Sequence, residues 1–150
     1  MKKWTVHDMI FLTERMCAAS AHKTGNDKKE RSVMAMTTRE CYTQMGADYD
    51  EVLNRLYSEE MIHRFALLFL KDDSFQNLKT QLAAQNVKEA FRAAHTLKGV
   101  CQNLGFSNLY APAVTLTETL RAGQMDGTAE QFAKVEEEYQ RTVQAIQAMD

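Results

Sequence analysis

Proline is almost absent from this chain of 150 residues, which has one proline and only six glycines. These two residues are the strongest helix breakers, so their scarcity favours long α-helices over a fold rich in turns. Strand-like alternation and hairpin turns are also missing. No stretch approaches 18 consecutive apolar residues, so a membrane-spanning helix is not expected. Together these absences predict an all-α fold without a membrane span.

A charge excess of either sign is lacking as well, because 18 lysines and arginines face 20 aspartates and glutamates, for a net charge of −2. This balance argues against nucleic-acid binding by the chain as a whole. The three cysteines, Cys17, Cys41 and Cys101, are an odd number and form no C-x-x-C pair. No secretory signal precedes them, so we expect a reduced, cytoplasmic protein.

The chain length suits one compact domain with an N-terminal appendage. Residues 1–34 are expected to form that appendage, as a helix over about 3–20 and a polar linker over 20–32; a true start at Met34 or Met36 is the alternative. Residues 35–150 are expected to form an antiparallel four-helix bundle with additional short N-terminal helices. Apolar spacing and capping residues predict helices over 37–46, 49–56, 59–70, from 73, over 86–104, over 107–121 and from 128. The expected N-caps are Thr37, Ser58, Asp73, Asn86, Ser107 and Thr128.

The helix expected from Asn86 to Leu104 carries the most informative pattern. Its apolar stripe consists of Val87, Ala90, Ala94, Leu97, Cys101 and Leu104. At about 100° per residue, His95 lies on the opposite flank. The residues within roughly 60° of it are Lys88, Arg92, Lys98, Gly99 and Gln102. An imidazole is therefore expected at the surface among cations, beside a mid-helix glycine that costs about 1 kcal/mol relative to alanine.

The segment His95-Thr96-Leu97-Lys98-Gly99, followed by Gln102-Asn103-Leu104-Gly105-Phe106, resembles the motif of histidine-containing phosphotransfer (Hpt) domains. The resemblance extends from about Thr37 to the C-terminus. It implies a helical bundle whose exposed histidine accepts a phosphoryl group in a two-component phosphorelay. His95 would become the phosphohistidine, and the partner would be a response-regulator receiver domain, a hybrid histidine kinase or both.

The chemistry of the residue types agrees with this role. A neutral imidazole nitrogen is a competent nucleophile near pH 7. Lys98, one turn after His95, can neutralise a phosphoryl oxygen, and Arg92 and Lys88 extend the positive field towards an acidic partner.

The partner is expected to cover Gly99 and Gln102, because a side chain at the glycine would obstruct its approach. In related domains a residue of the neighbouring helix orients the imidazole ring. Thr117 and Glu118 are the candidates here, and spacing alone does not choose between them.

Several other functions are not supported. The chain has no Gly-rich phosphate loop, so no ATP binding, no kinase activity of its own and no cofactor are expected; the magnesium ion belongs to the partner receiver domain. Glu60 and His63 match half of a di-iron ligand pattern, but the second pair is missing, so no metal site is expected. The chain is expected to be a monomer. The alternative function is a non-phosphorylated helical adaptor that binds a receiver domain or another acidic partner. The presence of both His95 and Lys98 argues against that adaptor.

Overall fold

The structure is a computed structural model, and it describes residues 36–149 of the chain as an all-helical fold. The helices are α2 (Thr38–Met45), α3 (Tyr49–Leu56), α4 (Glu59–Phe69), α5 (Ser74–Ala83), α6 (Val87–Leu104), α7 (Ser107–Arg121) and α8 (Thr128–Gln147). Within residues 36–149 there is no strand, and no helix has the length and hydrophobicity needed to cross a membrane. The helix expected over 3–20 and the linker after it lie outside the described residues, so the boundary near residue 34 stays a prediction.

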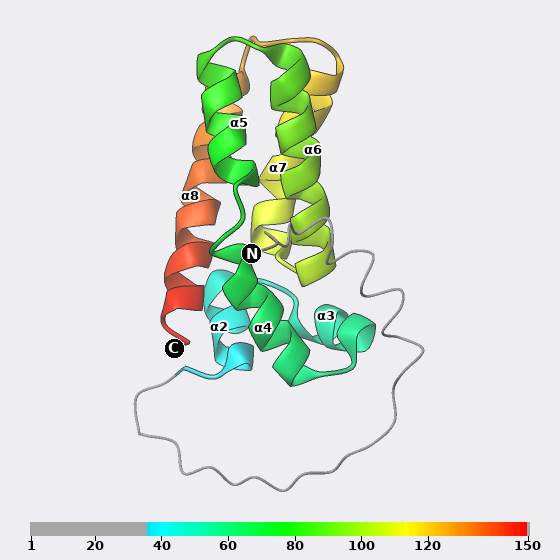
Figure 1. Cartoon of the computed structure of the whole chain (residues 1–150), viewed down its shortest axis with the longest axis vertical. Helices are drawn as coiled ribbons and strands as arrows, with labels where there is room; N and C mark the ends of the chain where they lie inside the picture. Colours follow the sequence, from blue (N-terminus) through cyan, green and yellow to red (C-terminus); the bar gives the residue numbers. More distant parts are fainter. Residues whose placement is uncertain (1–35, 150) are drawn as a thin grey trace, which may run out of the picture.

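Helices α5, α6, α7 and α8 form an antiparallel four-helix bundle in which each helix packs against the next (Figure 1). The shorter helices α2, α3 and α4 gather at the end of this bundle where α6 ends. There α2 packs against α8, and α4 packs against both α6 and α8. This arrangement confirms the expected bundle with additional short N-terminal helices.

Aromatic side chains close the side of the bundle between α5 and α8. The Phe75 ring stacks on the rings of Tyr139 and Phe132, with centroid distances of 3.8 and 5.5 Å. The ammonium of Lys79 pairs with the Glu136 carboxylate at 2.8 Å on the same side. Such rings bury large areas and add about 0.5–1.5 kcal/mol per pair beyond that area, so they stabilise the packing of α5 against α8.

A second aromatic group ties α2 and α4 to the start of α7. The fully buried Phe106 ring contacts the rings of Tyr42 and Phe69 at centroid distances of 5.5 and 5.1 Å. Phe106 directly precedes α7 and follows the Leu104-Gly105 end of α6. The turn from α6 to α7 is therefore anchored in the core that the short helices share with the bundle.

Three of the expected N-caps are confirmed. Thr37 and Glu40 form a complete capping box, in which the Thr37 side chain accepts a hydrogen bond from the Glu40 backbone N–H and the Glu40 carboxylate accepts one from the Thr37 backbone N–H. The Ser58 hydroxyl caps α4 by accepting a hydrogen bond from the Met61 backbone N–H at 3.3 Å. The Asn86 side-chain oxygen caps α6 by accepting one from the Glu89 backbone N–H at 3.3 Å. Each of these bonds joins residues three apart, which is why a local pattern predicts them.

Asp73 occupies the N-cap position of α5, as the sequence predicts, but its side chain makes no capping hydrogen bond. The neighbouring Asp72 instead accepts hydrogen bonds from the backbone N–H and the hydroxyl of Ser74. Burial raises the pKa of the Asp72 carboxyl, while the two Ser74 bonds lower it. The chain turns between α4 and α5 so that Asp72, and not Asp73, faces the free N–H groups.

The expectation that Ser107 and Thr128 are N-caps is wrong, because each is already the first residue of its helix. The Ser107 hydroxyl donates to the Gly105 carbonyl at 3.5 Å, and the Thr128 hydroxyl donates to the Met125 carbonyl at 2.7 Å. Glycines in the left-handed conformation, Gly105 with φ +69° and Gly127 with φ +79°, lie just before these starts. Their turns decide where the helix begins, which side-chain preference alone does not reveal.

Helix α3 ends at Tyr57, whose backbone lies in the left-handed region with φ +55°. This conformation costs roughly 1–2 kcal/mol for any residue that has a side chain, so glycine usually occupies such positions. The Tyr57 side chain is nonetheless 78% exposed, so packing within the described fold does not offset this strain energy.

Candidate functional site

Helix α6 has one buried and one exposed face, as its sequence predicts. The buried face consists of Ala90, Ala94, Leu97, Val100, Cys101 and Leu104. Val87 is only half-buried, and Val100 joins the stripe although the pattern did not include it. Burial raises the pKa of the Cys101 thiol far above its usual value, which suits a core residue and not a nucleophile.

The structure places all six predicted site residues on α6, on the side away from this stripe. Lys88, Arg92, His95 and Gln102 are exposed, and Lys98 and Gly99 are partly buried. At a rise of about 1.5 Å per residue, Lys98 and Gly99 lie within one turn of His95, whereas Lys88 and Gln102 lie about 10 Å away in opposite directions. The face thus has a compact centre around His95 and two outlying positions.

Gly99 is required neither by packing nor by backbone conformation. A Cβ atom placed on it would meet no heavy atom within 4 Å, and its φ is not positive. Glycine costs about 1 kcal/mol in mid-helix, and no packing contact or backbone requirement of the described fold offsets this cost. Open space beside His95 is the only structural consequence of this glycine that the described residues reveal.

The imidazole of His95 has an aromatic neighbour on the preceding turn. The Phe91 ring lies 5.8 Å from it between centroids, at an interplanar angle of 31°. The Arg121 guanidinium of α7 also lies over the Phe91 ring, 5.7 Å from its centroid. Within residues 36–149, neither ring nitrogen of His95 has a hydrogen bond to the protein, and the residue is exposed.

The two candidates for orienting the His95 ring have other hydrogen-bond partners. Thr117 is fully buried, and its hydroxyl donates to the Ala113 carbonyl at 2.6 Å. The Glu118 carboxylate pairs with Arg121 at 2.9 Å. The structure therefore leaves the choice between these two residues open. The structure also brings Arg121 close to the site, a residue that the sequence pattern did not identify. Its three-residue spacing from Glu118 is a recognisable ion-pair pattern.

The cations of α6 differ in how free their charges are. Arg92 pairs with Glu89 at 2.8 Å, so its charge is partly compensated. Lys88 and Lys98 have no ion pair with any residue that the structure describes. The positive field next to His95 thus comes chiefly from Lys98, with a second lysine about 10 Å further along the helix.

Comparison with protein families identifies the bundle. Residues 71–147, just over half of the chain, match the family model of the Hpt domain. The chain belongs to the Hpt domain family. No curated protein and no solved structure matches it significantly. Hpt domains take part in phosphotransfer in two-component systems and phosphorelays, where they interact with receiver domains and kinases.

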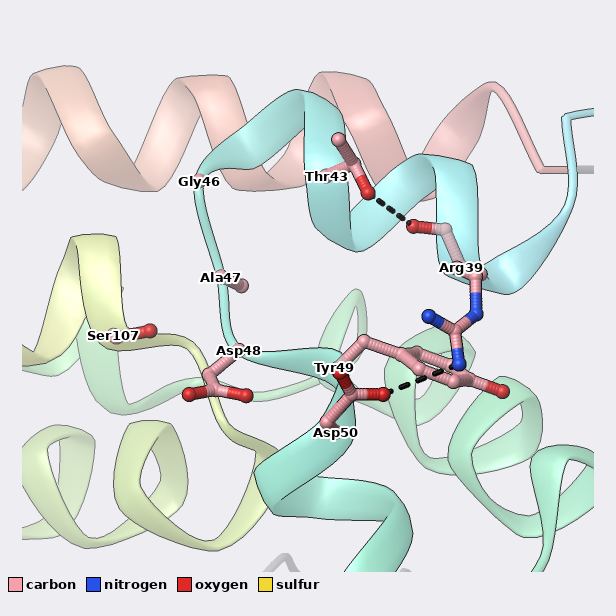
Figure 2. A pocket seen from close by; sticks show the side chains of 8 residues that line it. All are labelled: Arg39, Thr43, Gly46, Ala47, Asp48, Tyr49, Asp50 and Ser107. Atoms are coloured by element: carbon pink, nitrogen blue, oxygen red, sulfur yellow. Dashed lines mark hydrogen bonds and ion pairs between the residues drawn. The ribbon is translucent and has the colours of Figure 1, made fainter.

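The matched residues cover α5 to α8, so α2, α3 and α4 lie outside the part shared with the family model. An open cavity of about 360 Å³ lies where α2 turns into α3 (Figure 2). In it, Arg39 lies over the Tyr49 ring at 4.5 Å from the centroid and pairs with Asp50 at 3.1 Å. None of the six predicted site residues lines this cavity, and its Arg39 charge is already compensated.

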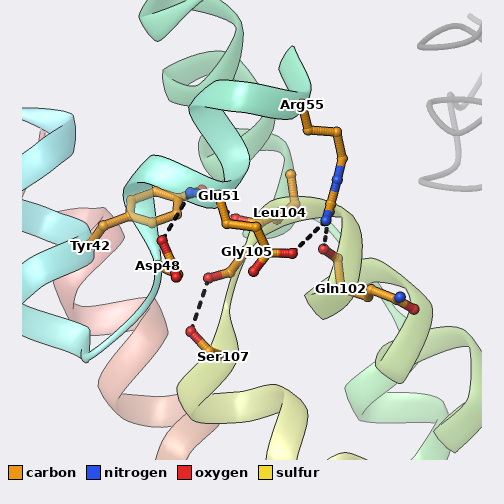
Figure 3. A network of polar contacts seen from close by, with 8 residues as sticks. All are labelled: Tyr42, Asp48, Glu51, Arg55, Gln102, Leu104, Gly105 and Ser107. Carbon is orange, nitrogen blue, oxygen red and sulfur yellow. Dashed lines mark hydrogen bonds and ion pairs between the residues drawn. The ribbon is translucent and has the colours of Figure 1, made fainter. Parts of the chain in front are cut away.

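Helices α2 and α3 also hold the end of the Hpt helix that carries His95 (Figure 3). The buried Tyr42 hydroxyl donates to the Leu104 carbonyl at 2.7 Å, and the Asp48 backbone N–H donates to the Gly105 carbonyl at 3.0 Å. The Arg55 guanidinium donates to the Gln102 carbonyl. The last carbonyls of a helix have no partner within the helix, and the Tyr42 hydroxyl supplies one for Leu104. The Arg55 and Asp48 donors add to backbone hydrogen bonds that the Gln102 and Gly105 carbonyls already accept. The short helices are therefore structurally part of the domain.

Proposed function

We propose that His95 is the phosphoacceptor of this Hpt domain, which exchanges a phosphoryl group with the aspartate of a response-regulator receiver domain. The observation that carries the proposal is the open space over Gly99, next to an exposed imidazole whose nitrogens are free of bonds to the described residues. Nothing inside the described fold explains that space, whereas an approaching partner does. A receiver is a suitable partner because it presents an acidic surface to the cations of α6.

In the proposed reaction, a neutral His95 ring nitrogen attacks the phosphorus atom of the receiver's aspartyl phosphate. A P–N bond forms as the P–O bond to the aspartate breaks, and the aspartate leaves as a carboxylate. The imidazolium formed loses its proton from the other ring nitrogen. The reverse sequence passes the group back to a receiver, so the same atoms serve both directions. The magnesium ion belongs to the receiver domain.

Lys98 is positioned to stabilise the charge of the phosphoryl group. Residues three apart on a helix have Cβ atoms about 5–6 Å from one another, within reach of a lysine side chain. Its ammonium acts as a point charge on an oxygen of the group in transfer. The Phe91 ring lies beside the imidazole, with 5.8 Å between the two ring centroids. We place this chain in the cytoplasm as a monomer, with a hybrid histidine kinase as a further partner.

The direct test uses isolated receiver domains from the same organism, each phosphorylated on its aspartate with acetyl phosphate. Transfer of label to this chain supports the proposed function. Binding without transfer would favour the non-phosphorylated helical adaptor instead, because such an adaptor needs the docking surface and not the nucleophile.

Replacing Lys98 by alanine should slow phosphoryl transfer by about tenfold to a hundredfold, because the phosphoryl group loses a neutralising charge. Receiver affinity should fall by less than about threefold, since one partly exposed charge adds little to binding. Transfer rates at saturating receiver, measured beside a binding titration, separate the two effects. Lys88→Ala is the matched control, and an equal loss of rate in that variant would show that only the general positive field matters.

Replacing Gly99 by glutamine should weaken receiver binding by more than about tenfold, because its side chain would occupy the surface that the partner must cover. Thermal stability should stay equal or rise slightly, since glutamine is the better helix former and a Cβ here meets nothing. Gly99→Ala controls for helix propensity and should bind nearly as wild type does. Normal binding by Gly99→Gln would disprove the close approach at this position.

A further inference from the structure

Arg55, at the end of α3, lies against the same stretch of α6 as the candidate docking residue Gln102. Its guanidinium donates to the Gln102 carbonyl and pairs with Glu51 at 2.6 Å (Figure 3). The two residues are 47 positions apart in the chain, so only the fold brings them together. The Arg55 side chain remains 36% exposed despite both contacts.

The size of a protein interface places Arg55 under a partner that docks at His95. A standard interface covers about 800 Å² on each partner, which corresponds to a patch about 16 Å in radius. Gln102 lies about 10 Å along α6 from His95 and within about 20° of it around the helix. A partner centred on His95 therefore extends over Gln102 and reaches the guanidinium that touches it.

Arg55 also retains hydrogen-bonding capacity for such a partner. A guanidinium has five N–H donors, and contacts with the described residues engage two of them, one with Gln102 and one with Glu51. The remaining donors suit the carbonyl or carboxylate oxygens of an acidic surface.

Tyr57 is the second observation, and it is independent of the first. It lies two residues after Arg55, so their Cα atoms are within about 7 Å of each other. Its ring is 78% exposed and its backbone is held in the left-handed region. An exposed tyrosine is a typical interface anchor, because it offers a large contact area for little loss of side-chain entropy. Internal packing does not explain a tyrosine at this position, whereas contact with a partner does.

We propose that Arg55 and Tyr57 form the rim of the receiver-docking surface and contribute to the choice of partner. The proposal rests on the proposed function, because it takes the receiver as the occupant. Helix α3 lies outside the residues that match the family model, so this rim is an addition to the shared α5–α8 bundle. The centre around His95 performs the transfer, and the end of α3 adds contacts that favour one receiver over another.

The test compares wild type with Tyr57→Gly and Arg55→Glu in titrations with each receiver domain that transfers label to the wild type. Tyr57→Gly should weaken binding by about fivefold to tenfold. Its melting temperature should nonetheless rise by about 2–5 °C, because glycine relieves the backbone strain. Arg55→Glu should weaken binding by at least tenfold through repulsion from the acidic receiver. Transfer rates at saturating receiver should stay within about twofold of wild type, because neither residue touches the phosphoryl group.

Arg141→Glu on α8 is the matched control, since Arg141 also pairs with a glutamate on its own helix. It should bind receivers as wild type does. If wild type accepts label but Tyr57→Gly binds every receiver normally, the rim is disproved while the proposed function stands. If Arg55→Glu unfolds the protein, the Tyr57→Gly titration decides. Failure of every receiver to label wild type would instead refute the proposed function itself.

Discussion

Replacing His95 by glutamine is expected to abolish phosphoryl acceptance completely, because glutamine has no nucleophilic nitrogen. The melting temperature should stay within about 2 °C of wild type, since the residue is exposed and makes no hydrogen bond to a described residue. Incubation of both proteins with a receiver domain phosphorylated by acetyl phosphate, followed by measurement of label transfer, provides the comparison. The label on wild type should be acid-labile and alkali-stable, as expected of phosphohistidine.

His63→Gln serves as the control for loss of a histidine in general. The His63 ring is half-buried and its Nδ1 lies 3.2 Å from the Thr38 hydroxyl, in a contact between α2 and α4. This variant should accept label at the wild-type level. Equal labelling of His95→Gln and wild type would contradict the assignment of the phosphoacceptor, and loss of labelling in His63→Gln alone would transfer it to α4.

Replacing Gly105 by alanine is expected to lower the free energy of unfolding by about 2–4 kcal/mol. The added Cβ would lie 2.8 Å from the Asp48 carbonyl oxygen and 3.0 Å from the Val52 Cβ, at a φ of +69°. The backbone of Asp48 has little freedom to withdraw, because its own N–H is bonded to the Gly105 carbonyl at 3.0 Å. The substitution therefore separates α3 from the end of α6. Urea unfolding followed by circular dichroism measures the loss.

Gly123→Ala separates the two contributions to that loss. Gly123 has a φ of +76°, but a Cβ there would meet nothing within 4 Å. Its replacement should cost about 1 kcal/mol, from the left-handed conformation alone. Equal destabilisation by the two substitutions would show that contact with Asp48 and Val52 contributes nothing at Gly105.

Local sequence patterns determined most of the site face. Helix α6 is amphipathic, and its apolar residues recur at the helical period, so the exposure of His95 followed from its position relative to that stripe. The Asn86 cap and the Thr37–Glu40 capping box depend on bonds between residues three apart. Interactions of such short range depend mainly on residues that are close together in the sequence. The all-α class followed in the same way from the scarcity of proline and glycine.

Turn geometry limited these local predictions. Ser107 and Thr128 are reasonable caps by residue type, but each of their helices begins one residue earlier than the cap predicts. Asp73 lies at the N-cap position of α5 without making the capping hydrogen bond. The preference of a side chain for capping is about 1 kcal/mol, which the packing of a neighbouring turn easily outweighs. Val100 is likewise absent from the apolar stripe that the sequence pattern predicts for α6, although packing in the bundle buries it.

Tertiary structure alone decided what surrounds the site. The Tyr42 hydroxyl reaches the Leu104 carbonyl across 62 positions of the chain, and Arg55 reaches Gln102 across 47. The hydrophobic periodicity of the sequence does not predict such pairs, because they depend on how α2 and α3 pack against the bundle. The same holds for Arg121, which comes to lie over Phe91 only because α7 packs beside α6. Sequence determined which residues face outward on one helix, and the packing of the other helices determined which residues accompany them.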